Sequence, residues 1–307
     1  MLIKSPLKSQ FKSQFKSQLK YWWLAIRPST LLASIGPILL GTALATRDVD
    51  INMGIFLLTL VCAMSLQIAV NLANDLFDGL SGVDSKQRVG PVRVVQAGLI
   101  SLSAIKLGLA LICTVAMLSG LYLAVEGGWW ILALGVLSLL GVFAYSAGPF
   151  PLASNALGEV TVLIFFGWVS VLGSYYLQAG TLSLLAFGLA TSAGLYSSAI
   201  MLVNNIRDIA TDQAVKKYTL VVILGEHKAR ILLAILITGA LIIHAIFAIQ
   251  VSSILWITTI LLVAPSYYVI KKGFTLQGPA LNSLLANVAQ VGFLYCFSVA
   301  LSLIIFL

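Results

Sequence analysis

Charged residues are scarce in this chain of 307 residues. Only 9% of the residues are Asp, Glu, Lys or Arg, whereas 60% are apolar and the mean hydropathy is +1.04. A water-soluble domain carries roughly a quarter of its residues as charged groups. The shortage excludes a soluble globular enzyme and a disordered protein, and it indicates an all-α protein that crosses a membrane several times.

Cysteine and histidine are also rare. Cys62, Cys113 and Cys296 lie inside apolar runs without paired spacing, which excludes a disulfide scaffold and is typical of small core residues. His227 and His244 have no partner at the spacing of metal ligands, so we interpret both as structural. The chain therefore lacks the nitrogen and sulfur ligands of a transition-metal centre.

Long apolar stretches predict nine transmembrane helices, at about 20 residues for each crossing. They lie near residues 22–46, 54–77, 103–125, 129–148, 158–178, 182–203, 229–249, 252–270 and 280–306. Residues 1–21 are then a basic N-terminal tail or interfacial helix, and residues 22–307 form the transmembrane domain. If the N-terminus is cytoplasmic, all of the 18 basic residues except Arg47 fall on the inner side. The net charge of +8 therefore reports topology, and no nucleic-acid partner is expected.

A first polar motif lies at the inner end of the second span. Its spacing of i, i+3, i+4 and i+7 places four side chains on one helical face, namely Asn71, Asn74, Asp75 and Asp78. Gly79 and Gly82 end this helix, and we expect the chain to turn so that Asp84 reaches back.

A second motif lies at the inner end of the sixth span. Its members repeat every four residues and again share one face, namely Asn204, Asp208, Asp212 and Lys216. The predicted topology places both motifs in the same compartment. Cations accompany both motifs, namely Arg88, Arg93, Arg207 and Lys217.

The acids of these motifs require a positive partner, because stacked carboxylates repel one another and lose solvation near a bilayer. Oxygen ligands without His or Cys favour Mg²⁺, which binds proteins through a few carboxylates together with substrate phosphates. Two facing acidic helices therefore predict a diphosphate held through Mg²⁺. Merely solvated loops do not explain the helical spacing, since acids contribute little to topology.

The motifs resemble those of the UbiA superfamily of intramembrane prenyltransferases. The resemblance rests on Asn74-x-x-x-Asp78 with Asp84, and on Asn204-x-x-x-Asp208-x-x-x-Asp212. It extends over roughly residues 22–306. The six-residue step from Asp78 to Asp84 and the segments 88–93 and 145–152 are similar to the branch that prenylates 1,4-dihydroxy-2-naphthoate. The resemblance implies a nine-helix bundle in a bacterial cytoplasmic membrane, with its active site facing the cytoplasm.

The resemblance also implies the substrates and the residues that bind them. A polyprenyl diphosphate and 1,4-dihydroxy-2-naphthoate would react to give demethylmenaquinone and CO₂, with Mg²⁺ as cofactor. The implied metal ligands are Asn74, Asp78, Asp84, Asn204, Asp208 and Asp212. The implied catalytic residues are Asp75, Asp78, Asp208 and Asp212, and the implied diphosphate-binding residues are Arg88, Arg93, Arg207, Lys216 and Lys217.

Aromatic side chains are expected to shield an allylic cation from water. The candidates for this wall are Tyr145, Phe165, Phe166, Trp168, Tyr175 and Tyr196, and Glu159 joins Tyr145, Phe166 and Trp168 as a candidate for the acceptor pocket. No general base stands out. Asp75 and Glu159 are both candidates, and Glu159 fits a helix N-terminus equally well.

Three other functions fit parts of the pattern. Two of them stay within the superfamily, namely phytyl transfer and prenylation of 4-hydroxybenzoate. A secondary transporter is the third, but transporters bind their substrates near the midplane of the bilayer and often contain inverted repeats. Because both motifs are predicted at one face, an enzyme is favoured.

Overall fold

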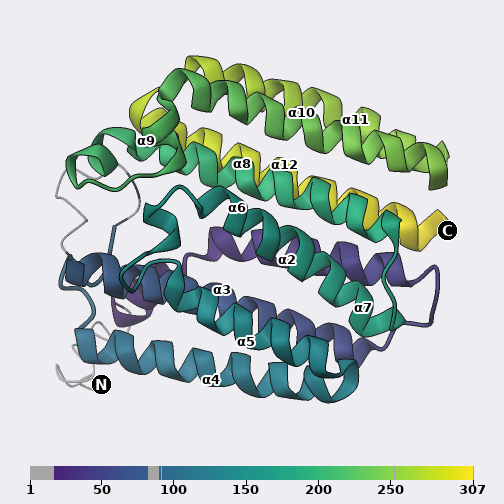
Figure 1. Cartoon of the computed structure of the whole chain (residues 1–307), viewed down its shortest axis with the longest axis horizontal. Helices are drawn as coiled ribbons and strands as arrows, with labels where there is room; N and C mark the ends of the chain where they lie inside the picture. Colours follow the sequence, from purple (N-terminus) through teal and green to yellow (C-terminus); the bar gives the residue numbers. More distant parts are fainter. Residues whose placement is uncertain (1–16, 82–89, 91, 252, 307) are drawn as a thin grey trace, which may run out of the picture.

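The computed structural model describes residues 17–81, 90, 92–251 and 253–306, and within these ranges the regular structure is helical (Figure 1). The longer helices lie side by side along one axis. Their bounds are α2 Pro28–Ala45, α3 Met53–Ser81, α4 Leu102–Gly127, α5 Trp129–Ala144, α8 Leu184–Ala214, α10 Glu226–Val251, α11 Ser253–Thr275 and α12 Leu281–Phe306. A further run is divided into α6 Gly158–Val162, η2 Leu163–Leu172 and α7 Gly173–Ala179, and α9 Leu220–Leu224 is a single short helix.

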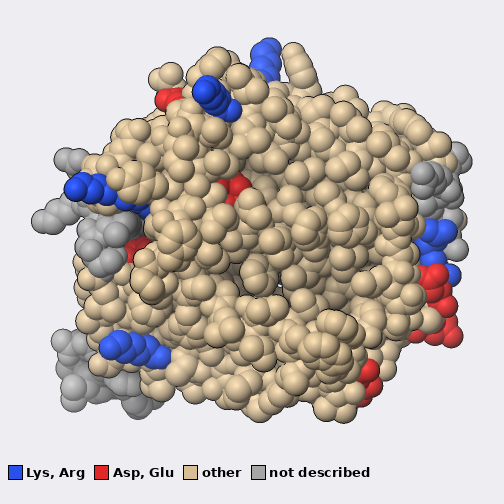
Figure 2. All heavy atoms as spheres, viewed as in Figure 1, with Lys and Arg blue, Asp and Glu red and all other residues tan. Residues whose placement is uncertain are grey.

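Seven helical segments in the described ranges are long and apolar enough to cross a membrane, by length and composition. They are Pro28–Ala45, Met53–Leu80, Leu102–Gly127, Gly158–Ala179, Leu184–Ala214, Glu226–Ile249 and Gly278–Phe306. Figure 2 shows mainly uncharged residues over the middle of the molecule and charged residues mostly toward its ends and edges. The prediction of a helical, multi-pass membrane protein is confirmed.

The first predicted span, residues 22–46, is not one continuous helix. A helix over residues 17–26 ends before Arg27, whose φ of 53° is left-handed, and α2 begins at Pro28. Proline lacks an amide hydrogen and disfavours the helical conformation in the residue that precedes it. The dipeptide Arg27-Pro28 therefore divides the predicted helix.

The interior contains two packed groups of apolar side chains. One is centred on α8, which packs against η2, α10 and α12. In the most apolar stretch of α8, 72% of the residues are buried. The other lies between α3, α4 and the segment that joins them. The α2 helix and the α6–η2–α7 run contribute to the first group and lie on its side toward α3 (Figure 1).

The segment η2 is a π-helix of ten residues. Gly167 lets it lie directly on α8, because a Cβ atom there would come within 2.7 Å of both the Ala190 carbonyl oxygen and the Gly194 Cα. Trp168 reinforces this contact, since its Nε1 donates to Oγ1 of Thr191 over 3.0 Å. π-Helical turns are rare and occur frequently at functional sites.

Candidate functional site

The first motif occupies the last turns of α3. Asp75 is buried at 1% exposure and accepts hydrogen bonds from the backbone amides of Val94 and Val95, over 3.1 and 3.0 Å. One turn later, Asp78 pairs with Arg93 over 2.5 Å. These bonds hold the segment after the motif against α3, so Asp75 fixes a loop with both of its oxygens. Asp84 and Arg88 lie outside the described residues.

Removing the Asp75 carboxylate should release this segment. We expect Asp75→Ala to lower the free energy of unfolding by about 3 kcal/mol, because two backbone amides lose a charged acceptor. Hydrogen exchange measured by mass spectrometry should show faster exchange in peptides that contain Val94 and Val95. Asp50→Ala, at an exposed position, serves as the control. Unchanged exchange in these peptides would contradict the role of Asp75 in holding the loop.

The second motif is organised by one arginine on α8. Arg207 donates to both carboxylate oxygens of Asp208, over 2.8 and 2.6 Å, and to Oδ1 of Asn204 over 2.8 Å. It also reaches Oδ1 of Asn282 on α12 over 2.9 Å. Asp212 pairs with Lys217 over 3.6 Å. The motif is therefore held in place by cations from its own segment.

The predicted cations differ in how accessible they are. Arg93 and Arg207 are each 7% exposed and are bound to acids, so their guanidinium groups shape the motifs. Lys216 is exposed with a φ of 57°, and Lys217 is half-buried. Any role of these four in binding a diphosphate stays a prediction.

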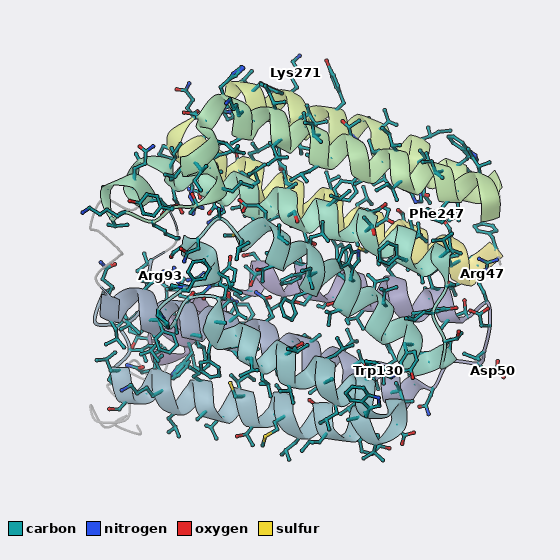
Figure 3. All side chains as sticks on the ribbon, viewed as in Figure 1. Arg47, Asp50, Arg93, Trp130, Phe247 and Lys271 are labelled. Atoms are coloured by element: carbon teal, nitrogen blue, oxygen red, sulfur yellow. The ribbon has the colours of Figure 1, made fainter. Side chains whose placement is uncertain are left out.

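The segment over residues 145–159 connects the two motifs. Oγ of Ser146 donates to Oδ1 of Asn74 in the first motif. Asn155 forms a parallel bridge with Tyr218, which follows the second motif. Figure 3 shows Arg93 at one end of the bundle, whereas Arg47 and Asp50 lie at the other end. Both motifs thus lie at the Arg93 end of the bundle, and residues 145–159 contact the first motif and the region of the second.

An apolar cavity of about 310 Å³ extends from this junction into the bundle. Asn74, Tyr145 and Met201 line the end near the motifs, whereas Ile131 and Leu177 line the far end. Figure 2 shows a hollow near the middle of the visible face, between the α6–η2–α7 run and α5 of Figure 1. The cavity can accommodate an apolar chain whose polar head stays at the motifs.

The structure separates the predicted aromatic residues into two sets. Tyr145, Phe165 and Phe166 line the cavity. Trp168 does not, because its indole is bound to α8 and stacks on Phe187 at 5.3 Å between ring centroids. Two more predicted wall residues are core residues whose hydroxyls are bound elsewhere, namely Tyr175 to Asp48 and Tyr196 to Ser266.

Glu159 contacts the second motif region, although it lies 46 residues before Asn205 in the sequence. It is buried at the start of α6 and accepts a hydrogen bond from Nδ2 of Asn205 over 2.9 Å. The sequence carries no spacing signal for Asn205, although this residue directly follows Asn204. Ser146 and Asn282 are likewise isolated polar residues without a spacing signal.

The oxygen donors of the motifs suit a hard cation such as Mg²⁺. Among the described residues, no group of three His, Cys, Asp or Glu is close enough to hold a metal ion. Mg²⁺ commonly binds through only one or two carboxylates and completes its shell with water and substrate phosphates. The residues therefore fit a cation that arrives with a phosphorylated substrate.

Comparison with known proteins identifies close relatives. The model of the UbiA prenyltransferase family matches residues 34–302. The chain is 40% identical over 250 residues to the 1,4-dihydroxy-2-naphthoate octaprenyltransferase of Escherichia coli, covering 80% of this chain and 81% of that protein. It is 31% identical to the Bacillus subtilis protein of the same name, covering 92% of each.

Solved structures show the same fold. A UbiA homologue from Archaeoglobus fulgidus, bound to DMAPP and Mg²⁺, superposes with a TM-score of 0.67 at 13% identity, covering 91% of this chain and 98% of the other. The apo structure of a homologue from Aeropyrum pernix K1 also gives 0.67, at 18% identity, with coverage of 90% and 97%.

Proposed function

Because the chain belongs to the UbiA prenyltransferase family, we propose that it transfers an all-trans polyprenyl group from its diphosphate to 1,4-dihydroxy-2-naphthoate, with release of CO₂. The observation that carries this proposal is the apolar cavity that Asn74 of the first motif lines, at the same end of the bundle as the second motif. A transporter would place its polar site near the middle of the bundle, and these motifs lie at one end.

We infer nine spans with a cytoplasmic N-terminus in a bacterial inner membrane. Adding α5 and α11 to the seven apolar segments gives this number. The directions of the first and last spans support an odd number of crossings. The helix α2 runs away from the Arg93 end toward Arg47, and α12 also finishes away from it (Figures 1 and 3). Most of the described basic residues lie toward the end that carries the motifs, which supports a site on the cytoplasmic side.

The two motifs would each hold Mg²⁺ together with the diphosphate. The first would use Asn74, Asp78 and Asp84, and the second would use Asn204, Asp208 and Asp212. Bound Mg²⁺ would supply positive charge that stabilises the departing diphosphate. Arg93, Arg207 and Lys217 hold the acids in position, and exposed Lys216 is free to approach the phosphates from solvent.

The cavity supplies a dry environment for the allylic carbon. When the C–O bond to the diphosphate breaks, the carbocation lies among apolar side chains, and the aromatic faces of Tyr145, Phe165 and Phe166 offer it negative electrostatic potential. Exclusion of water protects the cation from hydrolysis until the electron-rich ring attacks.

Purified protein in detergent should prenylate 1,4-dihydroxy-2-naphthoate in the presence of Mg²⁺, and EDTA should reduce the rate at least about a hundredfold. Restoring excess Mg²⁺ should recover the activity. Product formation is measured by liquid chromatography with octaprenyl diphosphate as donor. Parallel reactions with 4-hydroxybenzoate and with phytyl diphosphate test the two alternatives. Prenylation of 4-hydroxybenzoate but not of the naphthoate would refute the proposed acceptor.

A further inference from the structure

Glu159 and Asn205 are neighbours, and each buries an oxygen atom that has no donor within the described part of the chain. Glu159 is 5% exposed and Asn205 is 1% exposed. The single bond between them joins Nδ2 of Asn205 to Oε1 of Glu159, which leaves Oε2 of Glu159 and Oδ1 of Asn205 unpaired. A buried acceptor without a donor costs about 1–3 kcal/mol. The pair is therefore suited to a ligand that brings a hydroxyl group.

The pair adjoins residues of the cavity wall and of the second motif, since Asn205 directly follows Asn204. Glu159 shares a face of α6 with Val162, at i+3, and Val162 lines the cavity. Asn205 lies one turn beyond Met201, which also lines the cavity. Glu159 and Asn205 therefore lie on α6 and α8 within one helical turn of residues that line the cavity.

The other four carboxylates of the motifs in the described residues form charged or hydrogen-bonded contacts. Asp75 accepts hydrogen bonds from two backbone amides, and Asp78, Asp208 and Asp212 each pair with a cation. Protonation of any of these four carboxylates would weaken an ion pair or a bond that holds a loop. Glu159 is held instead by a neutral amide, so a proton transferred to it breaks no ion pair.

We propose that Glu159 is a catalytic residue whose Oε2 binds the ring hydroxyl next to the carboxylate of the acceptor and takes its proton. This inference rests on the proposed function. Asn205 holds the carboxyl through Oε1 and offers its Oδ1 to the same hydroxyl. The assignment also selects between the two candidate bases, because both oxygens of Asp75 accept bonds from backbone amides, and protonation of Asp75 would weaken those bonds.

The proton transfer balances over the complete reaction. Loss of the hydroxyl proton to Glu159 pushes an electron pair into the ring, and the carboxylate-bearing carbon forms a bond to the allylic carbon as the C–O bond to diphosphate breaks. The hydroxyl oxygen becomes a ketone, so the carboxylate now lies β to a carbonyl. Its C–C bond breaks to release CO₂, the electron pair returns to the oxygen, and Glu159 gives the proton back. The hydroxyl at the other ring position does not conjugate with the attacked carbon in this way.

Glu159→Gln tests the proton transfer with little risk to folding. The glutamine oxygen keeps the bond from Asn205, and its amide group can donate to Oδ1 of Asn205, which lacks a donor in the parent protein. We expect kcat to fall by about 10² to 10⁴, the usual contribution of a general base. The Kd of a non-hydrolysable polyprenyl diphosphate analogue should stay within about threefold, because Glu159 does not touch the head group.

Ser198→Ala provides the matched control. Ser198 donates to the backbone carbonyl of Glu159 over 2.8 Å, so the variant weakens the contact between α6 and α8 without changing the carboxyl group. Its kcat should stay within about threefold of the parent. An equal loss in Ser198→Ala would show that Glu159 acts only by docking α6, and full activity of Glu159→Gln would refute the proposal. If the parent itself fails to prenylate the naphthoate, the proposed function is at fault instead.

Binding of acceptor analogues gives a readout that a purely structural role would not change. Without any diphosphate donor, the parent should bind 1-hydroxy-2-naphthoate about tenfold to a hundredfold more tightly than 2-naphthoate, as a hydrogen bond to a charged group predicts. This ratio should shrink severalfold in Glu159→Gln and persist in Ser198→Ala. A ratio that does not differ between the parent and Glu159→Gln would overturn the contact with the hydroxyl.

Discussion

Asp208→Asn is expected to reduce turnover by at least about a hundredfold. The substitution removes the negative charge and one strong metal-binding oxygen, yet it keeps the size of the side chain. Arg207 retains Asn204 and Asn282 as acceptors, so the buried guanidinium is not left without partners. Initial rates measured over a range of Mg²⁺ concentrations should show a lower kcat and a higher Mg²⁺ requirement.

The control for this experiment is an acid at the opposite end of the bundle. Asp48 accepts a hydrogen bond from the Tyr175 hydroxyl over 2.6 Å, far from the motifs. Asp48→Asn should leave the Mg²⁺ dependence unchanged, because the amide oxygen still accepts this bond. If Asp208→Asn retained more than a third of the parent rate with the same Mg²⁺ requirement, the second motif would not be a metal site.

Gly41→Val should lower the free energy of unfolding at least as much as Asp75→Ala does. A Cβ atom at Gly41 of α2 would lie 2.2 Å from Oγ of Ser174 and 2.2 Å from the carbonyl oxygen of Val171. The carbonyl belongs to the backbone of η2 and cannot rotate away, so α2 and η2 must separate. Overpacking of this kind costs about 3 kcal/mol or more. Because both helices line the cavity, we also expect most activity to be lost.

The thermal unfolding midpoint in detergent measures this cost, at about 2–4 °C for each kcal/mol. Gly173→Ala is the matched control, since nothing lies within 4 Å of a Cβ atom built there and the residue also belongs to the wall of the cavity. Alanine favours a helix by about 1 kcal/mol over glycine, so this control should match or exceed the parent in stability. A midpoint for Gly41→Val within 2 °C of the parent would show that the two helices can move apart without cost.

Much of the fold follows from the sequence, because long apolar runs specify membrane helices and charged residues mark their ends. Apolar length alone, however, cannot show where a backbone breaks. The first run is apolar on both sides of Arg27-Pro28, so its length suggests one helix, whereas Pro28 divides the backbone there. Likewise, nothing in the composition of Leu163–Leu172 distinguishes a π-helix from an α-helix.

Residues that share one helix face could be predicted from their spacing, whereas contacts between side chains of different helices could not. Asn74 and Asp78 on α3, and Asn204 and Asp208 on α8, follow the helical period, so the shared face within each motif could be predicted from spacing. The partner of Glu159 could not, because Asn205 lies 46 residues away and meets it only when α6 packs on α8. Trp168 was misplaced for the same reason, since its neighbour Thr191 belongs to a different helix.

The π-helix also affects how the cavity tolerates changes in chain length. A π-helix holds one more residue in each turn than its i→i+4 counterpart, so deleting a single residue from Leu163–Leu172 would allow ordinary α-helical bonding. Each residue of an α-helix turns the chain by about 100°. A π-helical residue turns the chain by less, so α6 and α7 would keep nearly the same faces after such a deletion, whereas the residues between them, Phe165 and Val169 included, would shift along the cavity wall. The lining of this pocket can thus change by indel as well as by substitution.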